Sequence, residues 1–87
     1  MVYKFVFTSA AEKQIRSLDH SITRRILKKL RWIEHQDDPL RFATILHNSK
    51  IGDARFRVGD YRVVVILDIK NQRILIVAVG HRREIYR

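Results

Sequence analysis

Residues 53–79, DARFRVGDYRVVVILDIKNQRILIVAV, decide the fold of this chain. The stretch first alternates polar and apolar residues, then turns at Gly59-Asp60, and then continues in two apolar runs separated by Lys70-Asn71-Gln72. Alternation predicts a strand with one buried face, and a near-continuous apolar run predicts a strand in the middle of a sheet. Short turns of this kind join antiparallel neighbours. The expected strands cover residues 54–58, 61–69 and 73–79.

The first half of the chain predicts one more strand and two helices. Residues 2–7 alternate and are rich in Val, Tyr and Phe, which is typical of a strand. Ser9-Ala10-Ala11-Glu12 fits a capping box, so we expect Ser9 to cap a helix that runs to about Leu18. Asp19 or Ser21 caps a second helix, which Asp37-Asp38-Pro39 ends. Its apolar stripe holds Ile22, Ile26, Leu27, Leu30 and Ile33, and its opposite face holds Arg24, Arg25, Lys28, Lys29 and Arg31.

These elements predict an α+β fold in the order β-α-α-β-β-β, with two N-terminal helices packed on one face of a small, mainly antiparallel twisted sheet. A length of 87 residues suits one domain, so we expect residues 1–87 to form a single domain. No apolar run approaches the roughly 20 residues of a membrane span, and the N-terminus lacks a signal-peptide pattern. We therefore expect a cytoplasmic protein with no membrane association.

Positive charge dominates the composition. Eighteen Lys and Arg residues face nine Asp and Glu residues, which gives a formal net charge of +9. A field of this sign attracts polyanions such as RNA, DNA or an acidic protein partner. The basic face of the second helix is then either solvated surface or an electrostatic docking surface for RNA. The chain has no cysteine and its four histidines lack metal-ligand spacing, so we expect no metal and no cofactor.

Arginines gather at one end of the expected sheet. Arg55 and Arg57 lie two positions apart on one strand and therefore share a face. In a meander the start of the strand 61–69 lies beside the end of the strand 73–79, which brings Arg62 and Arg82 together. Arginine clusters of this kind suit phosphate. We expect a single concave patch formed by Arg55, Arg57, Arg62, His81, Arg82 and Tyr86.

Each of these residues also has a simpler structural interpretation. Arg55 and Arg57 are then plain solvent-facing residues, and Arg62 pairs with Asp60 or Asp53. His81 is then a surface histidine. Tyr86 is then a core residue that closes the sheet.

The element order and two segments of the chain resemble the RelE/ParE toxin superfamily of bacterial and archaeal toxin–antitoxin systems. The segments are RFRVGDYR, residues 55–62, and VGHRREIYR, residues 79–87. The resemblance covers the whole chain. It implies a toxin that enters the ribosomal A site and cuts messenger RNA there, because the RNA 2′-hydroxyl attacks its own adjacent phosphate. Such a protein positions the RNA, stabilises charge on the phosphate and manages two protons.

The resemblance also implies roles for individual residues. Arg62 would neutralise the scissile phosphate, Arg82 would act near the leaving 5′-oxygen, and Tyr86 would stack on a base. Lysines of the family that have been proposed as proton acceptors are replaced here by arginine, which is a poor general base. We therefore hypothesise that His81 assists proton transfer, since imidazole titrates near neutrality. The expected substrate-binding residues are Arg55, Arg57 and Arg83.

Three functions remain open at this point. The first is the ribosome-dependent endoribonuclease, with messenger RNA and the ribosome, including its 16S rRNA, as partners. The second is a ParE-like protein that poisons DNA gyrase by binding, and the third is a degenerate toxin that only binds nucleic acid or its antitoxin. In each case the resemblance implies a RelB-like antitoxin as partner, in a toxin–antitoxin hetero-oligomer. The arginine set with a nearby tyrosine favours the endoribonuclease.

Overall fold

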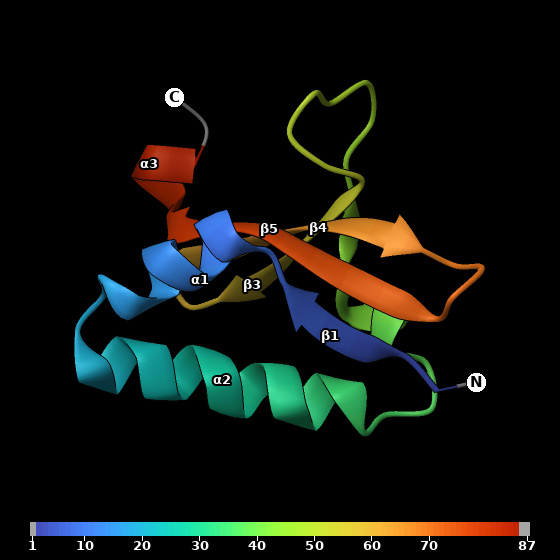
Figure 1. Ribbon diagram of the computed structural model, residues 1–87, viewed down its shortest axis with the longest axis horizontal. Coiled ribbons are helices and arrows are strands. Elements are labelled where there is room, and N and C mark those ends of the chain that lie inside the picture. The colour runs from blue at the N-terminus through green and yellow to red at the C-terminus, as the bar shows by residue number, and fades with distance from the viewer. Residues whose placement is uncertain (1, 86–87) are drawn as a thin grey trace.

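The computed structural model describes residues 2–85, in which two helices cover one face of a five-stranded sheet (Figure 1). The elements in chain order are β1 (Lys4–Phe7), α1 (Ser9–Arg16), α2 (His20–Glu34), the 3-10 turn η1 (Pro39–Phe42), β2 (Thr44–Ile45), β3 (Ala54–Val58), β4 (Tyr61–Asp68), β5 (Arg73–His81) and α3 (Arg82–Ile85). The predicted α+β class and element order are confirmed. The sequence did not predict η1, β2 or α3, which are all short.

The sheet has the order β1-β5-β4-β3-β2. β1 pairs with β5 in parallel, and every other pair is antiparallel. The chain reaches this order because the two helices carry it from β1 across the sheet, while β3, β4 and β5 follow as hairpins. The predicted Gly59-Asp60 turn joins β3 to β4, and Gly59 adopts a φ of 60°, a conformation that glycine accepts at little cost.

A bulge in β5 changes which side chains face the helices. Val64 pairs with Ala78 but Val65 pairs with Ile76, so Val77 is an extra residue in β5. Before the bulge the buried residues of β5 are even-numbered, as Ile76 is. After it the odd-numbered Val79 is buried instead. The bulge therefore decides on which face the last residues of β5 lie.

The core lies between the sheet and the two helices. The predicted stripe of α2 buries Ile26, Leu30 and Ile33, whereas Leu27 is 39% exposed. Phe56 of β3 is fully buried and contacts Phe5 of β1 edge to face, with ring centroids 5.4 Å apart. Burying a side chain of this size stabilises the fold by about 1.5–3 kcal/mol.

The helix ends differ from the prediction. The α1 N-cap is Thr8, whose hydroxyl accepts from the Ala11 N–H at 3.2 Å, so the capping box predicted at Ser9 is wrong by one residue. β1 runs almost directly into α1, and Thr8 keeps the extended conformation that a cap needs. α2 ends at Glu34, before the predicted stop at residues 37–39. The Glu34 carboxylate accepts from the Phe5 N–H at 2.8 Å and ties α2 to the edge strand β1.

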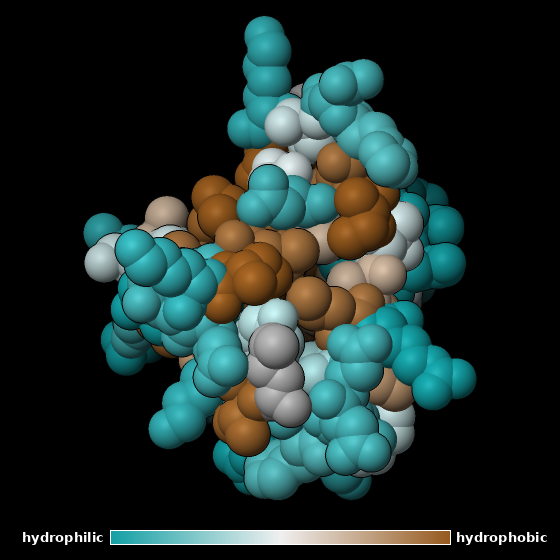
Figure 2. Space-filling model, turned by 90° about the vertical axis from the view of Figure 1, so that its right-hand side faces the viewer, coloured by the Kyte–Doolittle hydropathy of each residue, from teal (hydrophilic) through white to brown (hydrophobic). Residues whose placement is uncertain are grey.

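The second face of the sheet carries no long helix within residues 2–85. Val6, Leu75 and Ile66 form a cross-strand row on it, and the two outer residues are about 40% exposed. Figure 2 shows the end of the molecule at the right of Figure 1, where apolar side chains gather at the centre of the view, surrounded by polar ones. No helix in the described part of the chain is long and apolar enough to cross a membrane.

Candidate functional site

The candidate site lies where β3, β4 and β5 meet at the Gly59-Asp60 turn. Arg57 lies directly opposite Arg62 in the β3–β4 pair, and Arg62 lies directly opposite Gly80 in the β4–β5 pair. Directly opposed residues point to the same face of a sheet. The predicted proximity of Arg57 and Arg62 is therefore confirmed.

Arg62 is only 6% exposed, although it carries a guanidinium group. Its Nη1 donates to the Gly59 carbonyl at 2.9 Å and to the Tyr61 carbonyl at 3.0 Å. Within residues 2–85 no carboxylate oxygen lies within 4.0 Å of this guanidinium. A buried charge is costly unless an opposite charge completes its environment. The fold therefore holds a cation in a fixed position that suits an incoming anion such as phosphate.

Arg82 reaches the same turn from β5. Its backbone N–H donates to the Asp60 carbonyl at 2.8 Å, and its Nε lies 4.0 Å from the Asp60 carboxylate. Both side chains are more than half exposed, so this ion pair is weak and leaves the arginine available. Arg62 and Arg82 thus meet at one end of the sheet, as predicted from the strand order. The alternative pairing of Arg62 with Asp60 or Asp53 is not observed, because the Asp53 carboxylate binds the Leu67 N–H at 2.8 Å.

His81 lies on the other face of the sheet from Arg62. It is opposite Tyr61, and the two rings meet edge to face with centroids 5.5 Å apart. Its Nδ1 lies 3.1 Å from the Arg83 backbone nitrogen and must accept there, because an N–H can only donate. The expectation of one patch that includes His81 is therefore wrong. Without the bulge in β5, His81 would share the face of Arg62.

The other predicted residues have less defined positions. Arg55 is half-buried on the face of Arg62, Arg57 is exposed, and Arg83 is exposed in α3. Arg55 lies opposite Val64, so it is two residues further from the β3–β4 turn than Arg57 is. Tyr86 lies outside the described residues.

Two contacts that the sequence did not predict hold the end of β5. Beyond Ile76, β5 has no pairing with β1, and the Val79 N–H donates instead to the Gln14 side-chain oxygen of α1 at 2.8 Å. On the other side α3 folds back over the sheet, where a Cβ on Gly80 would lie 3.4 Å from Ile85. No local sequence pattern indicates either contact, because the partners come from different elements.

This arrangement suits the binding of an anion. Arginines outnumber the acidic residues there, which are Asp60 beside Arg82 and Glu84 in α3 beside Gly80, and arginine donates to phosphate in a bidentate manner. Within residues 2–85 no group of three or more His, Asp or Glu side chains is placed to hold a metal ion.

Comparisons with known proteins identify the family and the fold of this chain. A family model described as the ParE toxin of type II toxin–antitoxin systems, parDE, matches residues 5–86. A search of curated protein sequences gives no match.

Similar chains occur in solved toxin–antitoxin complexes. The RelBE2 complex of Mycobacterium tuberculosis contains a chain that is 25% identical, with a TM-score of 0.77, covering 94% of this chain and 100% of that one. The archaeal RelE–RelB complex of Pyrococcus horikoshii OT3 contains one that is 28% identical, with a TM-score of 0.72, covering 97% and 99%. The E. coli RelBE chain is 18% identical with a TM-score of 0.71, covering 92% and 96%, and at that identity it shows likeness of fold alone.

Proposed function

This chain belongs to the family of ParE toxins of type II toxin–antitoxin systems, within the RelE/ParE superfamily, and we propose that it is an endoribonuclease that cuts messenger RNA in the ribosomal A site. The observation that carries this proposal is Arg62. A toxin that acts only by binding another protein has no need of a buried guanidinium that, within residues 2–85, has no carboxylate partner. An enzyme that stabilises a phosphorane-like transition state needs such a group.

The proposed reaction needs little covalent chemistry from the protein. The RNA 2′-oxygen forms a bond to the adjacent phosphorus, the bond from phosphorus to the 5′-oxygen breaks, and a 2′,3′-cyclic phosphate remains. One proton leaves the 2′-hydroxyl and another reaches the departing 5′-oxygen. Arg62 binds the non-bridging oxygens, where charge builds up, and Arg82 supports the leaving oxygen. Arg55, Arg57 and Arg83 bind neighbouring phosphates, and Tyr86 stacks on a base.

The role of His81 is proposed in a narrower form. Because its Nδ1 accepts from the Arg83 N–H, only Nε2 is left to exchange a proton with RNA. The ring also fixes the start of α3, and so the direction in which Arg82 and Arg83 leave the sheet. We propose that His81 acts through this positioning. Direct proton transfer by Nε2 is the alternative role, and the His81 variants described in the Discussion distinguish the two.

The proposed partner in the cell is a RelB-like antitoxin, because the similar solved chains come from complexes with such proteins. An acidic or amphipathic antitoxin segment would suit a chain of net charge +9. The proposed assembly is a toxin–antitoxin hetero-oligomer in the cytoplasm.

Inhibition of DNA gyrase is the second candidate, since the matching family model is described as a ParE toxin. The experiment that decides adds the purified chain to a translating ribosome extract and maps the message by primer extension. Cuts within A-site codons are expected. An intact message, together with accumulating DNA breaks in cells that express the chain, would contradict the endoribonuclease and favour gyrase.

A matched pair of variants links that activity to the site. Arg62→Ala and Arg82→Ala are each expected to relieve growth inhibition while antitoxin binding stays measurable. Undiminished toxicity of both variants would remove Arg62 and Arg82 from the mechanism.

A further inference from the structure

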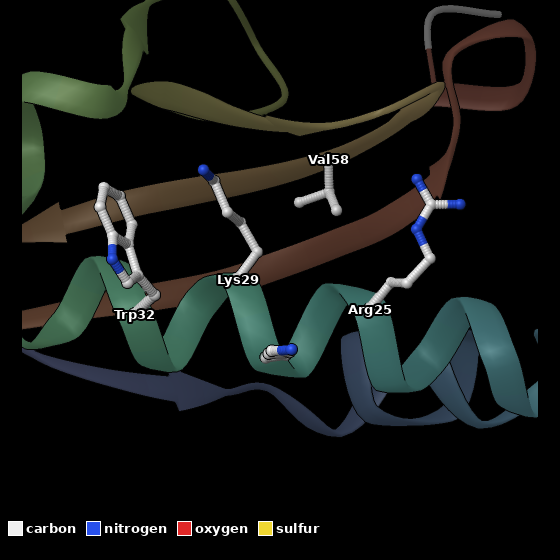
Figure 3. Close-up of a pocket in the computed structure, with 5 residues that line it drawn as sticks. Arg25, Lys29, Trp32 and Val58 are labelled. Carbon is white, nitrogen blue, oxygen red and sulfur yellow. The ribbon is translucent and has the colours of Figure 1, made fainter.

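A groove of about 400 Å³ lies between α2 and the edge of β3 (Figure 3). Figure 3 shows Arg25, Lys29 and Trp32 projecting from α2 on the side of Val58. Val58 and the indole give the groove an apolar floor. The residues that line it are Arg25, Lys28, Lys29, Trp32 and Val58, so no acidic side chain takes part.

Trp32 offers a fixed aromatic surface in this groove. Trp32 is 46% exposed, which is unusual because tryptophan is highly buried on average. Phe42 packs against the ring edge to face, with centroids 5.0 Å apart, and the Lys29 ammonium lies 4.5 Å from the ring centroid. These contacts hold the ring in place, with the Lys29 ammonium over one of its faces, while the residue as a whole stays partly exposed.

Within residues 2–85 the cations of α2 form no ion pair. The ion pairs in the described part of the chain join Arg16 to Glu12, Arg73 to Asp68 and Arg82 to Asp60, and none includes a residue of α2. Like charges at successive turns of one helix destabilise it unless anions bind. The groove therefore combines unneutralised cations with an exposed aromatic ring, which are the two features that bind single-stranded nucleic acid.

The groove begins at the same turn as the candidate site. A Cβ on Gly59 would lie only 2.8 Å from Arg25 Nη2, so this arginine lies against the β3–β4 turn. The carbonyl of the same glycine accepts from Arg62. Trp32 is two helical turns further along α2, about 10 Å from Arg25. A strand whose phosphate lies at Arg62 can thus continue around the turn and along α2.

We propose that this groove binds a single-stranded RNA segment next to the scissile phosphate, with one base stacked on Trp32 and phosphates bound by Arg25, Lys28 and Lys29. The proposal rests on the proposed function in taking RNA as the polyanion. Continuity with the arginine site and the aromatic surface among the cations favour RNA over an acidic peptide, which would need only the cations.

Trp32 is the only tryptophan of the chain, so its fluorescence reports on this groove alone. The test titrates a short 2′-O-methyl oligouridylate, which cannot be cleaved, into the purified full-length chain. Stacking is expected to quench the fluorescence. The Lys28→Gln/Lys29→Gln variant should bind about tenfold more weakly, and the slope of log affinity against log salt should fall by about 1.4, which is 0.7 for each lost phosphate contact.

Lys50→Gln/Lys70→Gln is the matched control, because both lysines are exposed outside the groove and the change in charge is the same. Its binding should stay within about twofold of the wild-type value. In fluorescence anisotropy, Trp32→Ala should lose about tenfold in affinity, and Trp32→Phe should recover most of it.

Two binding results would overturn the proposal, and so would one combination of binding with cleavage. One is quenching by an acidic peptide with none by the oligonucleotide, which would assign the groove to a protein. The other is equal weakening by the two double-lysine variants, which would mean that only net charge matters. Cleavage in ribosome extracts without quenching would refute the groove and leave the endoribonuclease standing. Quenching without cleavage would refute the endoribonuclease and leave the groove standing.

Discussion

The two ends of the β4–β5 hairpin each carry an arginine, and the fold treats the two differently. At the β4–β5 turn, Arg73 donates from Nε and Nη2 to the Asp68 carboxylate, at 3.2 Å and 2.9 Å. At the other end, Arg62 is buried and donates only to backbone carbonyls in the described part of the chain. Within residues 2–85 a carboxylate pairs with Arg73, where the arginine stabilises a turn, and none pairs with Arg62, where an external anion is expected to bind.

Replacing Arg62 or Arg73 by alanine tests this difference directly. Of the predictions made here, the Arg62 variant should show the largest change in cleavage rate. Arg62→Ala is expected to lower the rate of A-site cleavage by about 10²–10³-fold, because a fixed donor to the transition-state charge is lost. Arg73→Ala makes the same chemical change at the other end and should leave cleavage within about twofold, since no contact of the proposed chemistry is lost. Both rates are measured by primer extension in a ribosome extract. Equal losses in the two variants would mean that the arginines matter only through net charge.

The end of β5 beside Arg62 depends on Gln14, and this dependence predicts a smaller effect. Gln14→Leu leaves the Val79 N–H without its acceptor, so we expect a loss of about 1–2 kcal/mol in the free energy of unfolding. Cleavage should fall about tenfold, because Arg82 follows three residues later and loses its position. Gln14→Glu keeps an acceptor and should recover both values. Hydrogen exchange at the Val79 amide separates the variants, and unchanged exchange in Gln14→Leu would contradict this role.

His81 should give a smaller effect still, and two substitutions separate its possible roles. Asn places its side-chain oxygen near the position of Nδ1, whereas Gln places its amide near Nε2. If His81 acts by holding the Arg83 N–H, His81→Asn should keep single-turnover cleavage within about threefold of wild type and His81→Gln should lose more. Proton transfer by His81 would instead make both variants slow and remove a titration from the pH–rate profile. Full activity and an unchanged profile in His81→Gln would exclude both roles.

The smallest expected effect is a change in Tm from a substitution at the β4–β5 turn, where Asp68 pairs with Arg73. Hydrogen bonds from Asn71 and then Arg73 lower the pKa of Asp68 below its ordinary value of 3.8. A carboxylate with a lowered pKa stabilises the fold at neutral pH, and this contribution is lost as the pH falls through the folded-state pKa. Asp68→Asn should therefore lower Tm slightly at pH 7, and the difference from wild type should close below pH 3.8. If the difference in Tm between wild type and Asp68→Asn grew as the pH fell, the predicted direction of the pH dependence would be wrong.

Patterns with a short period predicted much of the fold. The alternation in β3 placed Arg55 and Arg57 on one face, and the turn residues Gly59-Asp60 fixed the hairpin that sets Arg57 opposite Arg62. The spacing of apolar residues in α2 identified Ile26 and its neighbours as core. These predictions succeeded because each depends on residues a few positions apart, which a strand or helix repeats regularly.

Tertiary structure alone decided how the site residues are arranged. The bulge at Val77 moved His81 away from Arg62, and a bulge arises from pairing between strands rather than from the bulged strand alone. Contacts between distant elements placed the Gln14 side chain on β5 and Arg25 on the β3–β4 turn. The sequence by itself determined which residue types reach this end of the sheet. The packing of strands and helices decided which cation is buried and which face each side chain shares, because burial and register depend on segments that meet only in the folded chain.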